Sequence, residues 1–382
     1  MDTVICSIIN ILYSLTAVYC LGILVMLYGL FRIPVYKTDK RHFLSVVIAA
    51  HNEEMTIEKC LQCLISQDYP KQLYEIIIAD DRSSDKTKEI ISYYSKRHEN
   101  IRSVRINTEE PFIPKKTALI KGLNIARGEI IVSTDADCIQ PAGWLTALNS
   151  HFSEEIGMVI GHTEYFKPDS FWEGIDSIDY FSQRVLGIAF LGLNSAYTCT
   201  ASNIAYRKEI FYNNKEDFIN AKVRPAEDNL ILHSVHLKSS YKIAAAFESS
   251  SIVTTNGASS FKHFMNQRFR WAAYGGNITT FGVKIFFIPL LLYYSYLCIS
   301  LFWAVFNPDI MNAFLVSFLY KMIVDFLFML KASVLYRCVY ILKYFFPISI
   351  IHVILIPIIV IKGNLSSFKW KDNIYNINSQ LK

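Results

Sequence analysis

Residues 129–137 have the sequence EIIVSTDAD, and this stretch decides the fold around it. Glu129 to Thr134 is a short apolar run rich in β-branched residues, which predicts a buried strand. The strand ends on two carboxylates one residue apart, Asp135 and Asp137. Carboxylate oxygens are the ligands that hard divalent cations prefer, so the turn after this strand is a candidate metal site. A DxD pattern alone is common, and its place directly after a strand is what gives it weight.

Strands and helices alternate along the chain before this motif. We predict strands at 44–50, 74–79 and 101–106, and helices at 55–67, 85–98 and 115–126. Such alternation is typical of a parallel sheet. Polar clusters follow the first two strands directly, at 51–54 and at 80–85. Ligands of open α/β sheets bind beyond the carboxyl ends of the strands, so we expect these clusters and the DxD turn to converge.

Each of these polar residues also has a structural explanation. Asp80 and Asp81 end a buried strand, where a carboxylate is costly unless it has partners. Asp favours turns and helix starts, and we assign that role to Asp85. We assign Asp81 to a nucleotide base, because two further acidic clusters share the same sheet edge. Lys115 and Lys116 begin the third helix, where contact with a phosphate and ordinary solvation are both open.

A second acidic pair, Glu227 and Asp228, opens a helical stretch from Asn229 to Leu237. Acidic residues complement the dipole at a helix start, which is one explanation of the pair. The other is catalysis, because a carboxylate can take the proton from an attacking hydroxyl group. Asp228 is our candidate base.

The composition indicates a mixed membrane protein. The chain is 52% hydrophobic and 14% aromatic, yet 19% of its residues are charged. Residues 4–31 carry no charge and are long enough to span a bilayer of roughly 30 Å. Three further candidate spans are Ile285 to Phe306, Ile310 to Leu330 and Cys338 to Ile361. We therefore divide the chain into an N-terminal anchor at 1–31, a catalytic domain at 42–282, a membrane region at 283–361 and a basic tail at 362–382.

The orientation of the membrane region is open at its C-terminal end. Basic residues after the first span place the catalytic domain in the cytoplasm. Three later spans would put the C-terminus outside, whereas the basic tail favours the inside. Pro347 and Pro357 interrupt the last segment, so a re-entrant or interfacial segment is the alternative. Lys321 and Asp325 are four residues apart in the middle segment, and we interpret them as a structural ion pair.

Residues 267–271, with the sequence QRFRW, lie just before the membrane region. They offer an amide, guanidinium groups and an aromatic platform, which suit a diphosphate and a sugar. An amphipathic helix on lipid headgroups has a similar composition, so the motif taken alone leaves both interpretations open. The net charge of +5 is dispersed, without the basic block typical of nucleic-acid binding, so we expect no nucleic-acid partner.

Together these residues resemble the membrane-embedded branch of the family 2 glycosyltransferases, which includes cellulose, chitin, hyaluronan and poly-N-acetylglucosamine synthases. That branch shares the motifs D, DxD, ED and QxxRW. They are matched here, in the same order, by Asp80-Asp81, Asp135-Ala136-Asp137, Glu227-Asp228 and residues 267–271. The resemblance implies an α/β GT-A (Rossmann-like) catalytic domain with one N-terminal and about three C-terminal transmembrane helices.

The resemblance also implies an activity. It is inverting transfer of a sugar from a UDP-sugar to a polysaccharide or lipid-linked acceptor at a bacterial inner membrane, forming a β-linkage. Mg²⁺ or Mn²⁺ would be held by Asp137 and Asp135, and the catalytic pair would be Asp228 and Glu227. The residues implied in nucleotide-sugar binding are Glu53, Asp80, Asp81, Lys115, Asp135, Gln267, Arg268, Arg270 and Trp271.

Two departures from the family pattern leave the acceptor open. Residues 199–203 lack the glycine pair common in the acceptor-side stretch, and Ala226 replaces a frequent Thr before the acidic pair. A ceramide glucosyltransferase-like enzyme, which moves one sugar to a lipid, is therefore the nearest alternative. A catalytically inert membrane scaffold or transport subunit is a further one.

Overall fold

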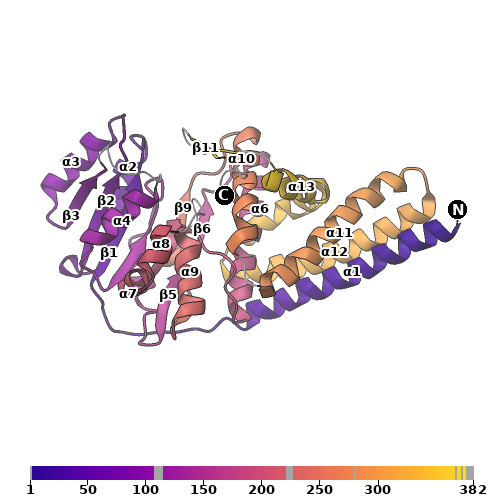
Figure 1. The fold of residues 1–382 in the computed structure, drawn as a ribbon, viewed down its shortest axis with the longest axis horizontal. Helices are drawn as coiled ribbons and strands as arrows, with labels where there is room; N and C mark the ends of the chain where they lie inside the picture. Colours follow the sequence, from indigo (N-terminus) through magenta and orange to yellow (C-terminus); the bar gives the residue numbers. More distant parts are fainter. Residues whose placement is uncertain are drawn as a thin grey trace. The chain divides into compact units, whose positions relative to one another are not determined.

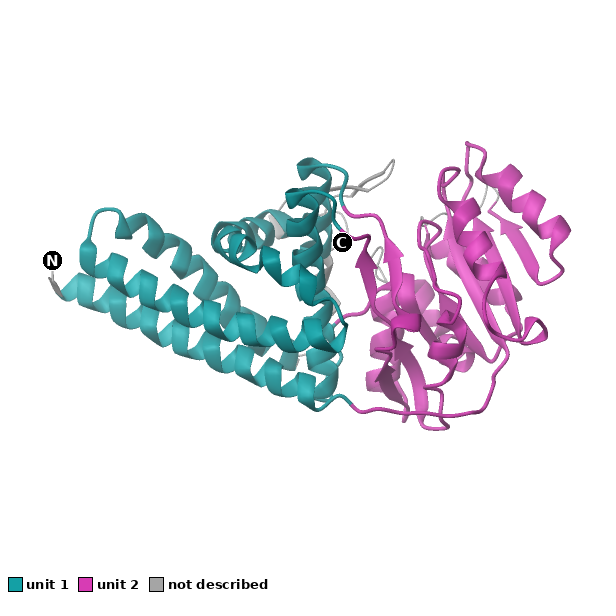
Figure 2. Cartoon of the chain, turned by 180° about the vertical axis from the view of Figure 1, so that it is seen from behind, with its two compact units in different colours: residues 1–33, 168–197, 258–382 teal, residues 34–167, 198–257 magenta. Residues whose placement is uncertain are grey.

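The structure is a computed structural model that describes residues 2–106, 115–220, 227–278, 281–365, 368–370 and 373–375. The chain forms two compact units (Figure 2). The sheet unit contains residues 34–167 and 198–257, and the helical unit contains residues 1–33, 168–197 and 258–382. Internal contacts thus place residues 168–197 and 258–282 with the apolar helices, although the sequence-based division puts them in the catalytic domain.

The sheet unit is built on a seven-stranded sheet with the order β3-β2-β1-β4-β7-β5-β8. Its strands are β1 (Leu44–Ala50), β2 (Tyr74–Asp80), β3 (Ile101–Arg105), β4 (Ile130–Ser133), β5 (Ile156–Ile160), β7 (Ile204–Arg207) and β8 (Lys242–Ala245). The first four in spatial order are parallel, as the alternating pattern predicts. β7 is antiparallel to both β4 and β5, so the sheet is mixed rather than parallel throughout. Two short strands, β6 (Thr163–Tyr165) and β9 (Val253–Thr255), pair separately.

Both faces of the sheet are covered, which explains why its strands are apolar without alternation (Figure 1). The helices of this unit are α2 (Ile57–Ile65), α3 (Thr87–Arg97), α4 (Lys116–Ile125), α5 (Trp144–Asn149), α7 (Lys208–Asn213), α8 (Lys215–Asn220) and α9 (Glu227–Lys238), with 3₁₀ turns η1 (Lys71–Leu73), η2 (Ala201–Asn203) and η3 (Ser249–Ser251). On one face, Val46 and Ile48 join the core that includes Ile57 of α2. On the other, a Cβ atom on Gly122 of α4 would stand only 2.8 Å from Val47. Glycine therefore lets α4 lie close to the sheet.

The carboxyl ends of the first strands are level, which positions the loops of interest. In the β1–β2 register Ala50 lies opposite Asp80, the last residue of each strand. The loops that leave these two strands therefore start at the same height on the sheet. This is the edge at which the polar clusters were expected.

The helical unit contains four helices long and apolar enough to cross a membrane, among the residues described. They cover Thr3–Phe31, Gly282–Ala304, Pro308–Leu335 and Val339–Gly363. The elements are α1 (Asp2–Phe31), α6 (Phe171–Gly192), α10 (Phe261–Ile278), α11 (Phe281–Ala304), α12 (Pro308–Leu335), η4 (Val339–Tyr344) and α13 (Phe345–Leu365), followed by the strands β10 (Phe368–Trp370) and β11 (Asn373–Tyr375). One apolar helix at the N-terminus and three at the C-terminus confirm the expected layout.

The prolines do not break the last of these helices. Pro347 lies in the first turn of α13, where a missing N–H has no partner to lose. Pro357 lies inside α13, and the helix continues to Leu365. The structure therefore has one continuous helix where the sequence left an interruption open.

The expected ion pair of α12 is confirmed. Lys321 is buried, and its Nζ lies 2.7 Å from Asp325 Oδ2. The hydroxyl of Tyr19 on α1 donates to Asp325 Oδ1 at 2.7 Å. The pair thus also joins α1 to α12, which lie side by side (Figure 1).

Candidate active site

The loops after β1 and β2 are fastened to each other at the carboxyl edge of the sheet. The Nδ1–H of His51 donates to the Asp81 carbonyl oxygen at 2.6 Å, and the N–H of Asn52 donates to Ser83 Oγ at 3.1 Å. Asn52 and Arg82 adopt left-handed backbone conformations, with φ of 53° and 57°. Asn tolerates that region better than most residues. The two turns consequently hold their polar groups at one place.

Lys115 joins two of the predicted acidic clusters. Its backbone N–H donates to Asp81 Oδ2 at 2.9 Å, and its Nζ lies 2.7 Å from Asp135 Oδ1. Asp81 follows β2, Asp135 follows β4, and Lys115 precedes α4, so three elements converge here. Lys115 is therefore ion-paired and is not an ordinary solvated lysine. Lys116 is not solvated either, because it is buried and donates to the Ile219 carbonyl oxygen at 2.8 Å.

Asp80 and Asp85 stabilise the turn between β2 and α3. Asp80 is buried, and its Oδ1 accepts the N–H of Ser83 at 3.0 Å. Asp85 Oδ1 accepts the N–H of Thr87, the first residue of α3, at 3.0 Å. Both carboxylates thus satisfy backbone donors, the role that short acidic side chains commonly have in turns.

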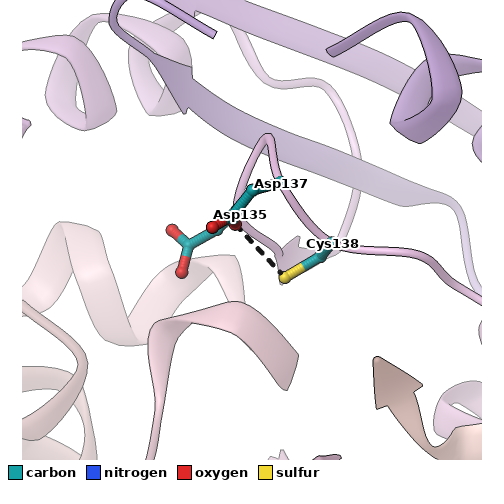
Figure 3. Close-up of side chains that lie close together, drawn as sticks. All are labelled: Asp135, Asp137 and Cys138. Carbon is teal, nitrogen blue, oxygen red and sulfur yellow. Dashed lines mark hydrogen bonds between the residues drawn. The ribbon is translucent and has the colours of Figure 1, made fainter. Parts of the chain in front are cut away.

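Asp135, Asp137 and Cys138 form a cluster that is suited to a cation (Figure 3). One ligand atom of each lies within 4.8 Å of the others. Burial, followed by the negative charges of Asp135 and Glu53, raises the pKa of Asp137 to about 6, against the lowering effect of Lys115. A half-buried carboxylate beside two other carboxylates is stabilised by a bound cation. The donor set therefore fits the expected Mg²⁺ or Mn²⁺, since both prefer oxygen ligands.

Cys138 was not predicted as part of this site. It is buried, and its Sγ–H donates to Asp137 Oδ1 at 3.7 Å. Burial raises the pKa of the Cys138 thiol, followed by the charges of Asp137 and Asp135, so the thiol stays protonated. It orients a carboxylate and is a poor metal ligand in this state. A lone cysteine has no spacing signal by which sequence reasoning finds it.

Asp228 lies in the first turn of α9 and is held by backbone donors. Its Oδ2 accepts the N–H of Ala201 at 3.0 Å, and its Oδ1 accepts the N–H of Asn229 at 2.8 Å. The Oδ1 of Asn229 accepts the N–H of Cys199 at 3.2 Å. The stretch that departs from the family pattern is therefore tied to the start of α9. Glu227 begins α9, but its side chain lies outside the described residues.

A small cavity places Asp228 near the end of β4. Asp228 and Ala201 line it together with Ser133, the last residue of β4, which is two residues before Asp135. The rest of its wall comes from largely apolar side chains of β1, β4, β7, α4, α8 and α9. The candidate base and the candidate metal site thus belong to the same region of the sheet unit.

The QRFRW motif lies on α10 of the helical unit, and Arg268 is its most buried residue. Only 1% of Arg268 is exposed, and its Nε and Nη2 pair with Asp179 Oδ2 at 2.7 Å and Asp176 Oδ1 at 2.6 Å. Its Nη1 donates to Gln267 Oε1. The guanidinium is thus engaged within the helical unit, whereas Arg270 is half-buried on the same helix.

Trp271 is packed among cations and a tyrosine. The guanidinium carbons of Arg268 and Arg184 lie 4.7 and 5.5 Å from its ring centre, and the Tyr180 ring lies 5.8 Å away. Arg184 and Tyr180 both belong to α6. The indole is therefore a packing contact between α10 and α6 in this structure.

Sequence reasoning missed the residues of α6 and α13 that contact Arg268, Asp179 or Trp271. They are Asp176, Asp179, Tyr180, Gln183, Arg184 and His352. The α6 members recur at intervals of three and four residues, which puts them on one face of the helix. Polar residues at this spacing in an otherwise apolar helix were therefore the sequence signal from which these α6 residues could have been predicted.

Comparisons with known proteins agree with this architecture. Residues 45–214 match the model of the family described as Glycosyl transferase family 2. Glycosyltransferase AglE of Haloferax volcanii is 34% identical over 133 residues, which cover 35% of this chain and 43% of that protein. A Methanococcus voltae enzyme, dolichyl N-acetyl-alpha-D-glucosaminyl phosphate 3-beta-D-2,3-diacetamido-2,3-dideoxy-beta-D-glucuronosyltransferase, is 30% identical over 169 residues, 38% of this chain and 51% of the relative. The chain spans about half the length of these relatives or less.

A solved structure matches nearly the whole chain. It is mannosyltransferase PcManGT from Pyrobaculum calidifontis in complex with GDP-Man and Mn²⁺, with a TM-score of 0.57 and 18% identity over 96% of this chain and 100% of that one. At this identity the likeness supports the fold alone. Residues 45–214 therefore match a glycosyl transferase family 2 domain, and the fold is GT-A-like; the described part of the chain also contains four helices apolar enough to span a membrane.

Proposed function

We propose that this protein is a membrane-bound inverting glycosyltransferase, which transfers a sugar from a UDP-sugar to a polysaccharide or lipid-linked acceptor and forms a β-linkage. The observation that carries the proposal is the bridge from Asp81 through Lys115 to Asp135, with Asp137 beside it. It joins three groups within one loop cluster: the Asp81 carboxylate as a candidate partner of the nucleotide base, the Lys115 ammonium group, and the candidate metal site of Asp135 and Asp137. A nucleotide diphosphate needs these three kinds of contact.

The donor is proposed to bind along this cluster. Asp81 Oδ1 is buried and makes no hydrogen bond within the described part of the chain, and the Arg82 guanidinium is 3.6 Å away. A buried acceptor without a donor is costly, and the N–H of a uracil ring would satisfy it. Lys115, Asp135 and Asp137 would then face the diphosphate. Glu53 would be a second residue in contact with the uridine.

Asp228 is proposed to act as the general base. Its carboxylate would take the proton of the acceptor hydroxyl while that oxygen attacks the anomeric carbon and UDP leaves from the opposite side. The two backbone N–H groups that it accepts hold the carboxylate in one orientation. A divalent cation held by Asp135 and Asp137 would neutralise charge on the leaving diphosphate. Inversion of an α-linked donor in this way gives a β-glycoside.

Names of relatives support the acceptor class. The Methanococcus voltae relative is named for a dolichyl phosphate-linked glycan, and a Bacillus spizizenii relative, 38% identical over 96 residues, is a poly(ribitol-phosphate) beta-glucosyltransferase. The four candidate spans support a multi-pass location in the membrane, and we propose that the catalytic residues face the cytoplasm. A ceramide glucosyltransferase-like enzyme remains the alternative, since a beta-monoglucosyldiacylglycerol synthase is also a relative.

Product analysis tests the proposal. The full-length protein in nanodiscs is given a panel of UDP-sugars, Mg²⁺ or Mn²⁺, and lipid-linked or oligosaccharide acceptors, and products are identified by mass spectrometry and NMR. We expect a β-linked product from a UDP-sugar. An α-linked product contradicts inversion. Addition of one sugar only, to a diacylglycerol or ceramide, favours the alternative. The absence of transfer from every UDP-sugar, despite folded protein, contradicts the proposed donor.

A further inference from the structure

The QRFRW helix is held in place by a buried ionic cluster that belongs wholly to the helical unit. We define it as Arg268 of α10, Asp176 and Asp179 of α6, and His352 of α13. The exposed fractions of Arg268, Asp176 and Asp179 are 1%, 1% and 4%. Because the cluster is buried, solvent and salt screen its interactions little. The three helices come from segments far apart in the sequence.

Asp179 is the centre of this cluster. It accepts hydrogen bonds from Arg268 Nε at 2.7 Å, from His352 Nε2 at 2.8 Å and from Gln183 Nε2 at 3.0 Å. Burial raises its pKa, but the Arg268 charge and the His352 hydrogen bond outweigh burial and lower the pKa to about 2. The carboxylate is therefore ionised and joins α6 to both α10 and α13.

Asp176 holds α10 at two points. Its Oδ1 pairs with Arg268 Nη2 at 2.6 Å, and its Oδ2 accepts the N–H of Ala258 at 2.7 Å, three residues before α10 begins. One carboxylate thus contacts the segment that leads into the helix and the middle of the helix. Together with Asp179, it engages two different nitrogens of a planar guanidinium, a geometry that restricts rotation of α10 about its axis.

α13 supports α10 from a second place. A Cβ atom on Gly363 would lie 2.6 Å from the Cβ atom of Ala272 and 3.1 Å from the Phe269 carbonyl oxygen. Only a residue without a side chain allows this approach. α10 is therefore confined by α6 and by α13, next to the QRFRW residues.

The cluster touches the motif residues directly. Arg268 donates to the Gln267 side chain, and its guanidinium lies 4.7 Å from the Trp271 ring centre. A buried ion pair stabilises a fold no better than an apolar contact of the same volume, and the best-attested use of such pairs is to select one register. The geometry therefore indicates orientation as the role of this cluster.

We propose that Asp176, Asp179 and His352 are positioning residues, which act through Arg268 to fix the rotation of α10 and so the directions of Gln267, Arg270 and Trp271. This inference rests on the proposed function for its catalytic consequence. It gives Arg268 the role of an anchor rather than of a ligand for the nucleotide sugar. None of the four residues needs to touch substrate.

The test compares Asp179→Asn with a matched control, Asp325→Asn, in full-length protein in nanodiscs. Asp325 is also a carboxylate of the helical unit that accepts two hydrogen bonds from buried partners, but it lies on α12 away from α10. We expect Asp179→Asn to lower transfer per folded molecule on the order of 10²-fold, as a misplaced positioning group does. Asp325→Asn should lower thermal stability and keep the specific activity. Asp179→Glu, which keeps the charge, should recover part of the loss.

A second measurement reports orientation without activity. Tyr180→Cys and Trp271→Cys are introduced together, because the two rings are 5.8 Å apart, and disulfide formation between them is followed by mass spectrometry. We expect fast cross-linking in the otherwise native chain, slower cross-linking with Asp179→Asn, and unchanged cross-linking with Asp325→Asn. Equal cross-linking in all three backgrounds, or equal specific activity of the two Asn variants, overturns the proposal. If Asp179→Asn does not accumulate, Asp179→Glu is compared with Asp325→Glu: a smaller loss of transfer and of cross-linking rate is expected in Asp179→Glu alone, and equal values for the two Glu variants overturn the proposal.

The two measurements separate this inference from the proposed function. If the native chain transfers no sugar, the proposed function fails, and the cross-linking rates still decide whether Asp179 orients α10. If transfer occurs and cross-linking is insensitive to Asp179, the positioning role fails alone.

Discussion

At the scale of single residues, the properties of the carboxylates depend on neighbours that lie far away in the sequence. Asp137 is half-buried beside Asp135 and Glu53, and its pKa is raised to about 6. Asp179 is buried beside a guanidinium, and its pKa is lowered to about 2. An aspartate carboxylate is therefore suited to bind a cation at position 137, whereas at position 179 its charge is already neutralised by Arg268.

Replacement of Asp137 is expected to lower metal-dependent transfer strongly. Asp137→Ala removes a carboxylate from the candidate metal site, so charge on the leaving diphosphate is no longer neutralised. We expect transfer to fall by roughly 10²-fold or more, as for other groups that stabilise transition-state charge. Turnover and Mn²⁺ binding in the presence of UDP are measured. Asp68→Ala, an exposed carboxylate of the same unit, is the control and should behave as the native chain. Full activity of Asp137→Ala in EDTA contradicts both the metal and its site.

Replacement of Asp228 is expected to separate binding from catalysis. Asp228→Asn keeps the shape of the side chain but cannot take the acceptor proton, so the rate should fall by roughly 10² to 10⁴. Affinity for the UDP-sugar, measured by calorimetry, should stay close to that of the native chain. A loss of affinity equal to the loss of rate would identify Asp228 as a donor ligand or a helix cap.

At the scale of secondary-structure elements, α9 carries a half-buried histidine, His233, in the same helix as the candidate base. Both ring nitrogens of His233 are buried and make no hydrogen bond among the residues described. Burial, and then the charge of His236, lower the pKa of His233 to about 4 from 6.5. Protonation of this ring is therefore unfavourable in the folded helix.

The stability of α9 is expected to fall in acid. Between pH 6.5 and 4 the unfolded state binds more protons at His233 than the folded state, so stability rises with pH and is lost as pH falls below 6.5. The loss approaches about 1.4 kcal/mol per pH unit for one group. Hydrogen exchange of α9, corrected for its intrinsic pH dependence, measures this at pH 7.5 and 5. His233→Leu should remove most of the dependence, and His263→Leu, at an exposed position of the other unit, should not. An unchanged slope in His233→Leu contradicts the assignment.

At the scale of the whole molecule, the chain combines a sheet unit that carries the acidic loops with a helical unit whose described residues form four candidate spans. Nucleotide sugars are made in the cytoplasm, and the basic residues after α1 favour that side for the sheet unit. Since α13 is continuous, the three C-terminal helices would put the C-terminus on the opposite side.

Reporter fusions are expected to show this topology. A periplasmic reporter inserted near residue 110 should stay silent, and one fused to the C-terminus should be active if α11, α12 and α13 all cross. Expression of each fusion is checked by immunoblot as the control. A strong periplasmic signal near residue 110 contradicts the cytoplasmic placement. A silent C-terminal fusion contradicts three C-terminal crossings and favours an interfacial α13.

The sequence by itself determined the local features. The strand at 44–50, the DxD turn after β4 and the four long apolar helices follow from periodicity, side-chain branching and length, which are properties of neighbouring residues. The convergence of the acidic loops was also predictable, because parallel strands end at one edge of a sheet.

Only the tertiary structure decided which side chains meet. It showed that Lys115 joins Asp81 to Asp135, that β7 reverses the sheet, and that Arg268 is enclosed by carboxylates of α6. Asp179 lies 89 residues from Arg268 and 173 residues from its other partner, His352. Local spacing carries no information about such pairs, because their meeting depends on how whole helices pack. The position of a motif was readable from the sequence, whereas the groups that orient it were determined by packing.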